Sequence, residues 1–167
     1  GIRGMYAEAL GLFRQVGDRL GEANTLKAQG DVYGFLKRND EALGVYAEAL
    51  GLFRQVGPRL AEANTLKAQG DVYRFQDRND EALGVYAEAL GLFRQVGDRL
   101  GEANTLQAEG DVYGLRQRQV GIRGMYAEAL GLFRQVGDRL GEANTLKAQG
   151  DVYRFQDRND EALGVYA

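Results

Sequence analysis

The chain has 167 residues, 44% of them hydrophobic, and its 21 basic and 24 acidic side chains are interleaved along the sequence. This balance lacks the concentrated positive charge that phosphate backbones and anionic membranes attract, so we expect neither nucleic acid nor a membrane as a partner. His, Cys and Ser are all absent, which excludes Ser or Cys nucleophiles with a His base and also His or Cys metal sites.

Carboxylate, Tyr, Lys and Thr side chains recur at fixed positions along the chain instead of forming one unique cluster, which argues against an active site. We therefore expect a non-enzymatic protein with no catalytic residue, no cofactor and no bound metal. No run of about 18 apolar residues predicts a membrane span, and no signal peptide is visible at Gly1. A cytoplasmic location is the default expectation.

A strict period of 40 residues runs through the chain, marked by Tyr6, Tyr46, Tyr86, Tyr126 and Tyr166. Self-similarity at such a period is typical of solenoid proteins, in which each repeat packs only on its neighbours. We expect a single solenoid over residues 1–167, made of about four repeats and cut within a helical hairpin at both ends.

Each period predicts two helices. The first, in the copy at about 58–75, places one apolar face at steps of three and four residues: Leu60, Ala63, Leu66, Gly70 and Tyr73. The second, at about 80–96, has a wider stripe that should pack against two neighbours: Ala82, Leu83, Tyr86, Ala89, Leu90, Phe93 and Val96. The repeating unit is therefore predicted to be a hairpin of two antiparallel helices.

Turn residues mark the ends of these helices. The residue after "QVG" is Asp in three copies and Pro58 in the fourth, and both types favour a helix N-terminus. Gly57 and Gly97 are predicted to end the second helix of a repeat in a left-handed conformation. Asn79 or Asp80 is predicted to cap the start of the second helix at about 80–96. The stretch at 77–81 is rich in oxygen ligands but lacks the Gly and Glu of a calcium loop, so capping explains it better.

The residues Leu66, Gln69, Gly70 and Tyr73 stand at the spacing W-x-x-L-G-x-x-Y, and Ala82, Tyr86 and Ala89 follow at the spacing of a second helix. In this the whole chain resembles a tetratricopeptide array in its long, 40-residue form. The resemblance implies an all-α, right-handed α-solenoid of antiparallel helix hairpins. It departs from the family pattern where the usual loop glycine is Lys37, Asp77 or Asp157.

The resemblance also implies that the first helix of each repeat lines the concave face and binds a protein, as a peptide or a partner helix. The polar residues expected there recur at steps of three and four. They are Asn24, Lys27, Asp31, Asn64, Lys67, Asp71, Arg74, Asn104, Gln107, Asp111, Asn144, Lys147, Asp151 and Arg154. The competing interpretation is a solvated face with local ion pairs.

Two functions stay open at this stage. One is a protein-interaction scaffold that uses the concave groove, and the other is a structural array that stacks end to end on copies of itself through uncapped terminal helices. The near-identity of the repeats favours the second, because recognition at distinct positions needs distinct chemistry.

The glycines lead to two further expectations. Gly70 and its equivalents Gly30 and Gly110 should let the two helices of a hairpin cross closely, opposite Ala82 or its equivalents. Ile122 takes the place of that alanine in one hairpin, so Ile122→Ala should tighten the crossing there. Because Ala61 replaces a repeated glycine, alanine should also stabilise the chain at the equivalent positions 21, 101 and 141.

Overall fold

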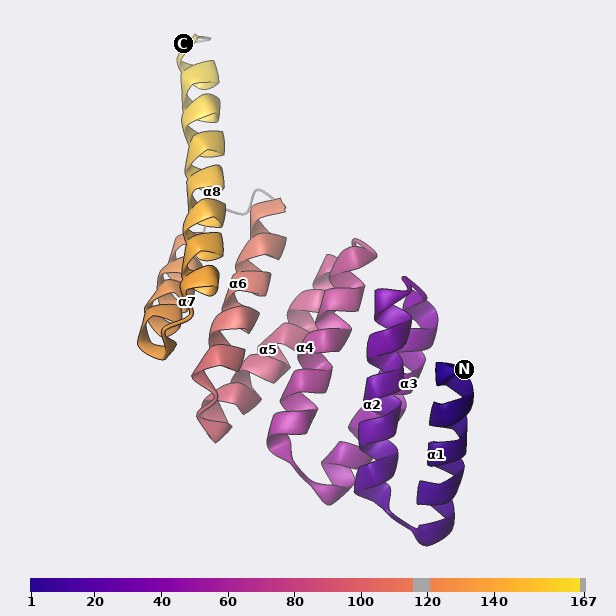
Figure 1. The fold of residues 1–167 in the computed structure, drawn as a ribbon. Coiled ribbons are helices and arrows are strands. Elements are labelled where there is room, and N and C mark those ends of the chain that lie inside the picture. The colour runs from indigo at the N-terminus through magenta and orange to yellow at the C-terminus, as the bar shows by residue number, and fades with distance from the viewer. Residues whose placement is uncertain (116–120, 166–167) are drawn as a thin grey trace. The chain divides into compact units, whose positions relative to one another are not determined.

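The computed structural model describes residues 1–115 and 121–165, and these ranges contain eight helices and no strand (Figure 1). The predicted all-α class is confirmed. The helices are α1 (Ile2–Val16), α2 (Arg19–Phe35), α3 (Asn39–Val56), α4 (Arg59–Phe75), α5 (Asn79–Val96), α6 (Arg99–Leu115), α7 (Ile122–Val136) and α8 (Arg139–Val165). The bounds of α4 and α5 match the predicted helices at about 58–75 and 80–96.

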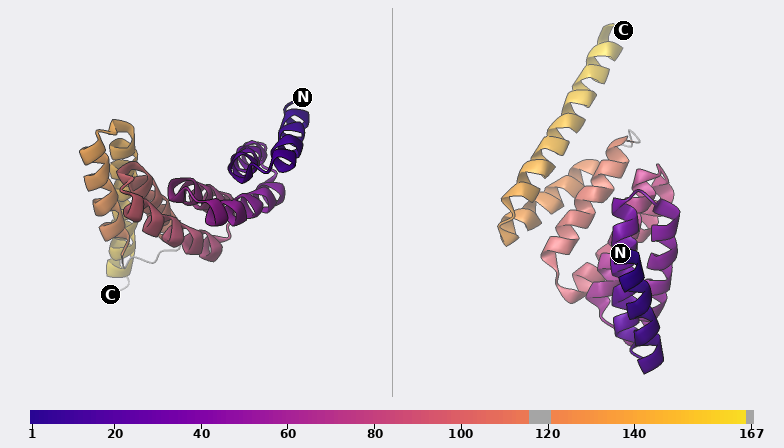
Figure 2. Two further views of the ribbon diagram at one scale, coloured as in Figure 1. Left: turned by 90° about the horizontal axis from the view of Figure 1, so that it is seen from below. Right: turned by 45° about the vertical axis from the view of Figure 1, so that its right-hand side comes forward.

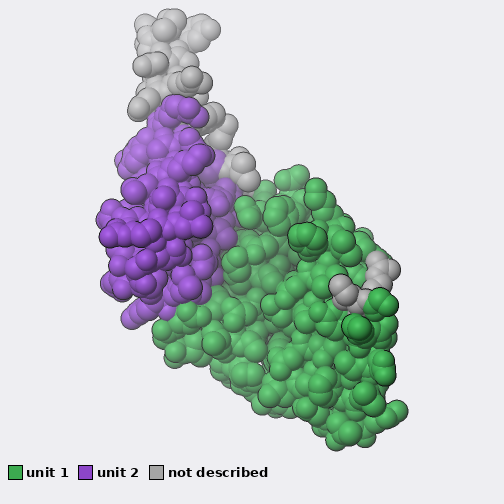
Figure 3. All heavy atoms as spheres, in the orientation of Figure 1, with its two compact units in different colours: residues 1–98 green, residues 99–167 purple. Residues whose placement is uncertain are grey.

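The chain divides into two compact units, residues 1–98 and residues 99–167, which Figure 3 shows in green and purple. In the first unit, α2 packs along α3 and α4 along α5, and in the second, α6 packs along α7. These are the predicted antiparallel hairpins, and Figure 2 shows them from two further sides. A single continuous solenoid over residues 1–167 stays a prediction.

The core of the first unit lies where neighbouring hairpins meet. Leu50 of α3, Leu66 of α4 and Phe93 of α5 belong to one buried cluster. The expected stripe of α5 is mostly buried, but Leu83 is half-buried and Val96 is 42% exposed. The expected face of α4 is exposed at Leu60, to 43%. Val96 is the last residue of α5, and Leu60 is the second residue of α4.

The helix starts are partly as predicted. Asp18 accepts a hydrogen bond from the backbone N–H of Gly21 at 2.8 Å, and Pro58 takes the equivalent position before α4. The expectation that Asn79 or Asp80 caps α5 is wrong, because Asn79 is already the first helical residue and the preceding Arg78 makes no capping bond. Arg78 instead forms an ion pair with Glu81 at 3.0 Å, along the first turn of α5.

Backbone conformations at the turns explain two sequence features. Gly97 ends α5 with φ of 75° and ψ of 21°, the predicted left-handed stop, whereas Gly57 ends α3 with φ of 113° and ψ of −30°, outside the left-handed helical region. Lys37 and Asp77, which replace the usual loop glycine, also adopt a positive φ of 56°. Side chains are strained in this conformation, so the two substitutions cost stability that glycine would not.

The last predicted turn does not form. Residues 154–160 repeat the sequence of 74–80, yet α8 continues as one helix to Val165. Residues 74–80 instead span the end of α4 and the start of α5, and these two helices pack on each other. The same seven residues therefore lie in a turn in one copy and in a continuous helix in the other.

The repeated glycines face tyrosine rings, a contact that the sequence did not predict, and the close approach to alanine stays a prediction. A Cβ atom at Gly70 would lie 2.5 Å from the ring of Tyr86, and one at Gly110 would lie 2.7 Å from the ring of Tyr126. Tyr86 is fully buried. Glycine at this position makes room for an aromatic ring of the partner helix.

Candidate protein-binding groove

Two helices of the first unit carry seven of the predicted partner-binding residues. Figure 1 shows α2 and α4 one beside the other, with α3 and α5 behind them. A groove of about 410 Å³ lies between α2 and α4, with Phe53 of α3 in its lining. The structure brings five predicted residues together there: Asn24, Lys27, Asn64, Lys67 and Asp71.

The two asparagines are the groove's unoccupied hydrogen-bonding groups. Asn24 and Asn64 are exposed, and neither side chain bonds to any residue within 1–115 or 121–165. A side-chain amide offers both a donor and an acceptor, which is the pair of functions that a peptide backbone presents. Asn104 on α6 and Asn144 on α8 are exposed in the same way in the second unit.

The lysines and aspartates are paired with each other along the helix. Lys27 Nζ donates to Asp31 Oδ2 at 2.7 Å, and Lys67 repeats the contact to Asp71 at the same distance. In α8, Lys147 binds Asp151 at 2.8 Å and thereby lowers the pKa of that carboxyl group. The ion pairs of the competing interpretation are therefore present, and they leave each lysine with further N–H donors.

Three aspartates at this repeat position are also bonded to the second helix of their hairpin. Asp31, Asp71 and Asp111 accept hydrogen bonds at 2.7–3.0 Å from the hydroxyl groups of Tyr46, Tyr86 and Tyr126, respectively. Burial of these tyrosines, then the neighbouring carboxylate charge, raise the pKa of each hydroxyl well above its usual value. The aspartates thus have a structural role that the sequence pattern did not indicate.

The remaining predicted residues lie elsewhere. Arg74 follows the groove lining on α4, and its guanidinium lies 5.4 Å from the ring centroid of Phe75. In the second unit, Gln107 of α6 takes the place of a lysine, and Arg154 of α8 lies 3.5 Å from Asp151.

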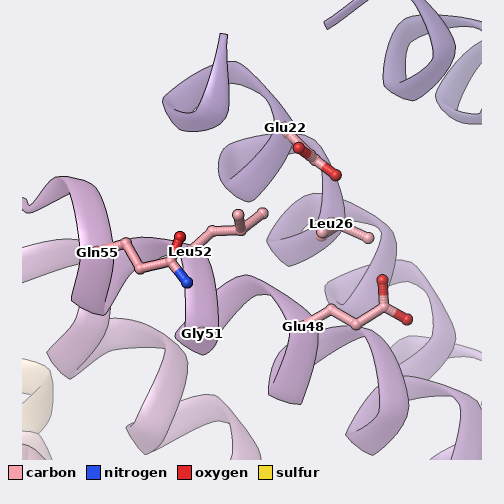
Figure 4. Close-up of a pocket in the computed structure, with 6 residues that line it drawn as sticks. All are labelled: Glu22, Leu26, Glu48, Gly51, Leu52 and Gln55. Carbon is pink, nitrogen blue, oxygen red and sulfur yellow. The ribbon is translucent and has the colours of Figure 1, made fainter. Parts of the chain in front are cut away.

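A shallow depression between α2 and α3 was missed by the sequence analysis (Figure 4). It measures about 250 Å³, and its lining includes Glu22, Leu26 and Glu48. Arg14 binds Glu22 at 2.6 Å and lies 3.9 Å from Glu48, so one guanidinium links α1, α2 and α3. Its hydrogen bond lowers the pKa of Glu22. The sequence contained a signal for this ion pair, since an arginine and a glutamate recur eight residues apart in every repeat, as Arg14 and Glu22 do.

Within the described ranges, no group of three or more acidic side chains is placed to hold a metal ion. None of the helices described there is long and apolar enough to cross a bilayer.

Comparisons with known proteins agree with the helix hairpins. Residues 56–120 match the family model described as Tetratricopeptide repeat. A comparison with curated protein sequences found no match. Among solved structures, BtubC (BKLC) from P. vanneervenii is similar, with a TM-score of 0.75 and 19% identity over 98% of this chain and 71% of that one.

Two further structures share the fold at low identity. Aspartyl phosphate phosphatase F from Bacillus subtilis has a TM-score of 0.71 and 10% identity, over 84% of this chain and 40% of that one. A Signal Transduction ATPase with Numerous Domains (STAND) protein with a tetratricopeptide repeat sensor, from Pyrococcus horikoshii, has a TM-score of 0.62 and 18% identity, over 100% of this chain and 30% of that one. This chain spans less than half the length of either. The repeat model and the helix hairpins identify residues 56–120 as tetratricopeptide repeats and confirm that the array resembles that family.

Proposed function

We propose that the chain is a non-enzymatic protein-interaction scaffold that binds an extended peptide or a partner helix in the groove between α2 and α4. One observation carries the proposal: Asn24 and Asn64 face the same groove with hydrogen-bonding groups that no described residue occupies. Two amides on successive repeats can each bond to the backbone of one bound segment, as in other modes of peptide recognition. Lys27 and Lys67 add donors for its carbonyl or carboxylate groups.

The test is peptide selection followed by measured affinity. A peptide selected from a display library on the intact chain is titrated against that chain and against the Asn24→Ala/Asn64→Ala variant. Both asparagines are exposed, so the variant should keep its thermal stability and lose at least about tenfold in affinity. Gln95→Ala, on the exposed side of α5, is the matched control and should bind as the parent chain does. If the double variant bound the peptide as tightly as the parent chain, the groove between α2 and α4 would be excluded as the binding site.

Self-association is a second candidate, supported by the surface of α1. Leu12 is 55% exposed there, whereas the equivalent Leu92 of α5 is only 8% exposed. Met5 and Val16 add further exposed apolar surface on the same helix. Light scattering over a range of concentrations should then report oligomers that disperse in Leu12→Glu, and a monomer at every concentration would exclude this function.

A further inference from the structure

The loop that joins α2 to α3 carries apolar side chains that the fold leaves in solvent. Phe35 is 87% exposed and Leu36 49% exposed, and in the next hairpin Phe75 is 73% exposed. Phe35 and Phe75 line one cavity of about 490 Å³ together with Gly34, Lys37 and Asn39. We call these five residues the loop pocket. None of them lines the groove between α2 and α4.

The loop pocket coincides with the part of the repeat that varies most. The four copies carry Leu36, Gln76, Arg116 and Gln156 at one position, and Lys37, Asp77, Gln117 and Asp157 at the next. No other position in the repeat has three residue types. Uniform repeats cannot distinguish partners by position, whereas a surface that differs between repeats can. Variation concentrated beside an exposed aromatic ring points to recognition rather than to architecture.

Gly34 keeps the loop pocket open. A Cβ atom there would lie no closer than 3.8 Å to Val72, its nearest neighbour, so the position has free space. The equivalent residue in the next hairpin is Arg74, whose guanidinium lies 5.4 Å from the ring centroid of Phe75. An arginine at position 34 could lie beside Phe35 in the same way and would add positive charge and bulk next to the pocket.

The charge beside the two rings is positive and unpaired. Lys37 lines the pocket and forms no ion pair with any residue in the ranges that the structure describes. In the next hairpin the same position is Asp77, which has the opposite charge and the same backbone conformation. A carboxylate next to an apolar side chain is therefore the chemistry that complements this loop and not the next one.

We propose that the loop pocket binds a peptide segment of a partner protein in which an aromatic or aliphatic side chain stands next to an aspartate or glutamate. The apolar side chain lies against Phe35 and Phe75, and its acidic neighbour pairs with Lys37. The loop pocket is a second docking site, additional to the groove of the proposed function, and it selects the partner by charge.

The test is a titration of the isotope-labelled intact chain, followed by the backbone amide shifts of residues 34–39. The probe is a synthetic heptapeptide with Glu beside Phe–Leu, flanked by Gly and Ser, and its charge-reversed form carries Lys in place of Glu. The acidic probe should shift these amides in a saturable way at millimolar peptide. The charge-reversed probe should bind roughly fivefold more weakly, because one surface ion pair is exchanged for a repulsion.

Two variants distinguish binding in the loop pocket from nonspecific binding to exposed apolar side chains. Gly34→Arg/Leu36→Gln/Lys37→Asp gives the first loop the sequence of the second, which already folds at 74–77, and it should weaken binding of the acidic probe by about tenfold. Phe35→Ala should do the same. Leu60→Ala, which removes a 43% exposed apolar side chain outside the pocket, should leave the affinity unchanged.

Three results would overturn the proposal. One is the absence of shifts at 34–39 with the acidic probe, and another is equal binding of both probes. The third combines two measurements: the acidic probe causes no shift, and the sedimentation coefficient of the chain without peptide is lower for Phe35→Ala than for the parent. That result would assign the pocket to a second copy of this chain.

Discussion

Gly21 donates its backbone N–H to Asp18 at 2.8 Å, and a Cβ atom at position 21 would lie 2.6 Å from the second oxygen of the same carboxylate. It would also lie 2.5 Å from the ring of Phe13. The expectation that alanine stabilises position 21 assumed free space, and the structure contradicts it. Position 141 is blocked in the same way by Phe133. The one natural alanine, Ala61, follows Pro58, which has no carboxylate to meet it.

Residues 18 and 21 should therefore be energetically coupled. Gly21→Ala alone should lower the free energy of unfolding by about 1 kcal/mol, since crowding outweighs the gain in helix propensity. After Asp18→Pro, the contact with the carboxylate is gone and only the contact with the Phe13 ring remains, so the same alanine should cost less, with a favourable coupling of up to about 1 kcal/mol in a double-mutant cycle. Gly44→Ala is the control: its Cβ meets nothing within 4 Å, so it should stabilise by about 0.5–1 kcal/mol. Additive effects in the cycle would refute the coupling.

Gly70→Ala tests the packing of glycine on tyrosine. The added methyl group would meet the ring of Tyr86, which is fully buried and held by its hydrogen bond to Asp71. We expect the free energy of unfolding to fall by about 2 kcal/mol, because the ring has little room to move. Denaturant titration measures the loss. Gly84→Ala, in α5 with open space around it, should be neutral or stabilising, and a similar loss there would point to a general effect of alanine.

Ile122→Ala reverses an expectation drawn from the sequence. The expectation that alanine at position 122 tightens the hairpin rests on placing Ile122 opposite Gly110. In the structure, the nearest atoms to Gly110 belong to the ring of Tyr126. Ile122 itself is 2% exposed. Truncation of a buried isoleucine leaves a cavity, so the variant should lose about 2–4 kcal/mol in unfolding free energy. An unchanged or higher melting temperature would contradict the burial of this residue.

The sequence was sufficient to predict the helices, because a period of 40 residues with apolar steps of three and four leaves few alternatives for a chain this regular. It also predicted that Asn24, Lys27, Asn64, Lys67 and Asp71 share a face. It could not predict that Tyr86 binds Asp71, since residues 15 apart meet only once the angle between α4 and α5 is known. Nor could it predict that residues 154–160 stay helical, because the identical segment at 74–80 contains a turn.

Asp77→Gly should relieve strain in the loop between α4 and α5. Asp77 has φ of 56°, a conformation that costs a side-chain-bearing residue about 1–2 kcal/mol, and part of that cost is offset by the greater freedom of glycine in the unfolded chain. We expect a net stabilisation of about 1 kcal/mol, measured as a higher denaturant midpoint with an unchanged slope. Asp77→Ala keeps the strain and should not stabilise. If both variants behave alike, the positive φ is not the source of the effect.

Alkaline pH should unfold the chain through its buried tyrosines. Burial, then the charge of Asp71, raise the pKa of Tyr86 well above the usual tyrosine value of about 10. The folded state thus holds the phenol proton more tightly than the unfolded chain does. The resulting stability is complete below about pH 10 and is lost as the pH rises above it.

Tyr86→Phe isolates this contribution. At neutral pH it should cost about 1–2 kcal/mol, because the hydrogen bond to the Asp71 carboxylate is lost while the ring stays buried. In denaturant titrations from about pH 8 to about pH 11, the variant should lose less stability with rising pH than the parent chain. Tyr46→Phe should remove a similar part of the pH-dependent stability in the hairpin of α2 and α3. The double variant should lose the sum of the two contributions. A parallel decline in the parent chain and the double variant would show that other groups cause the alkaline loss.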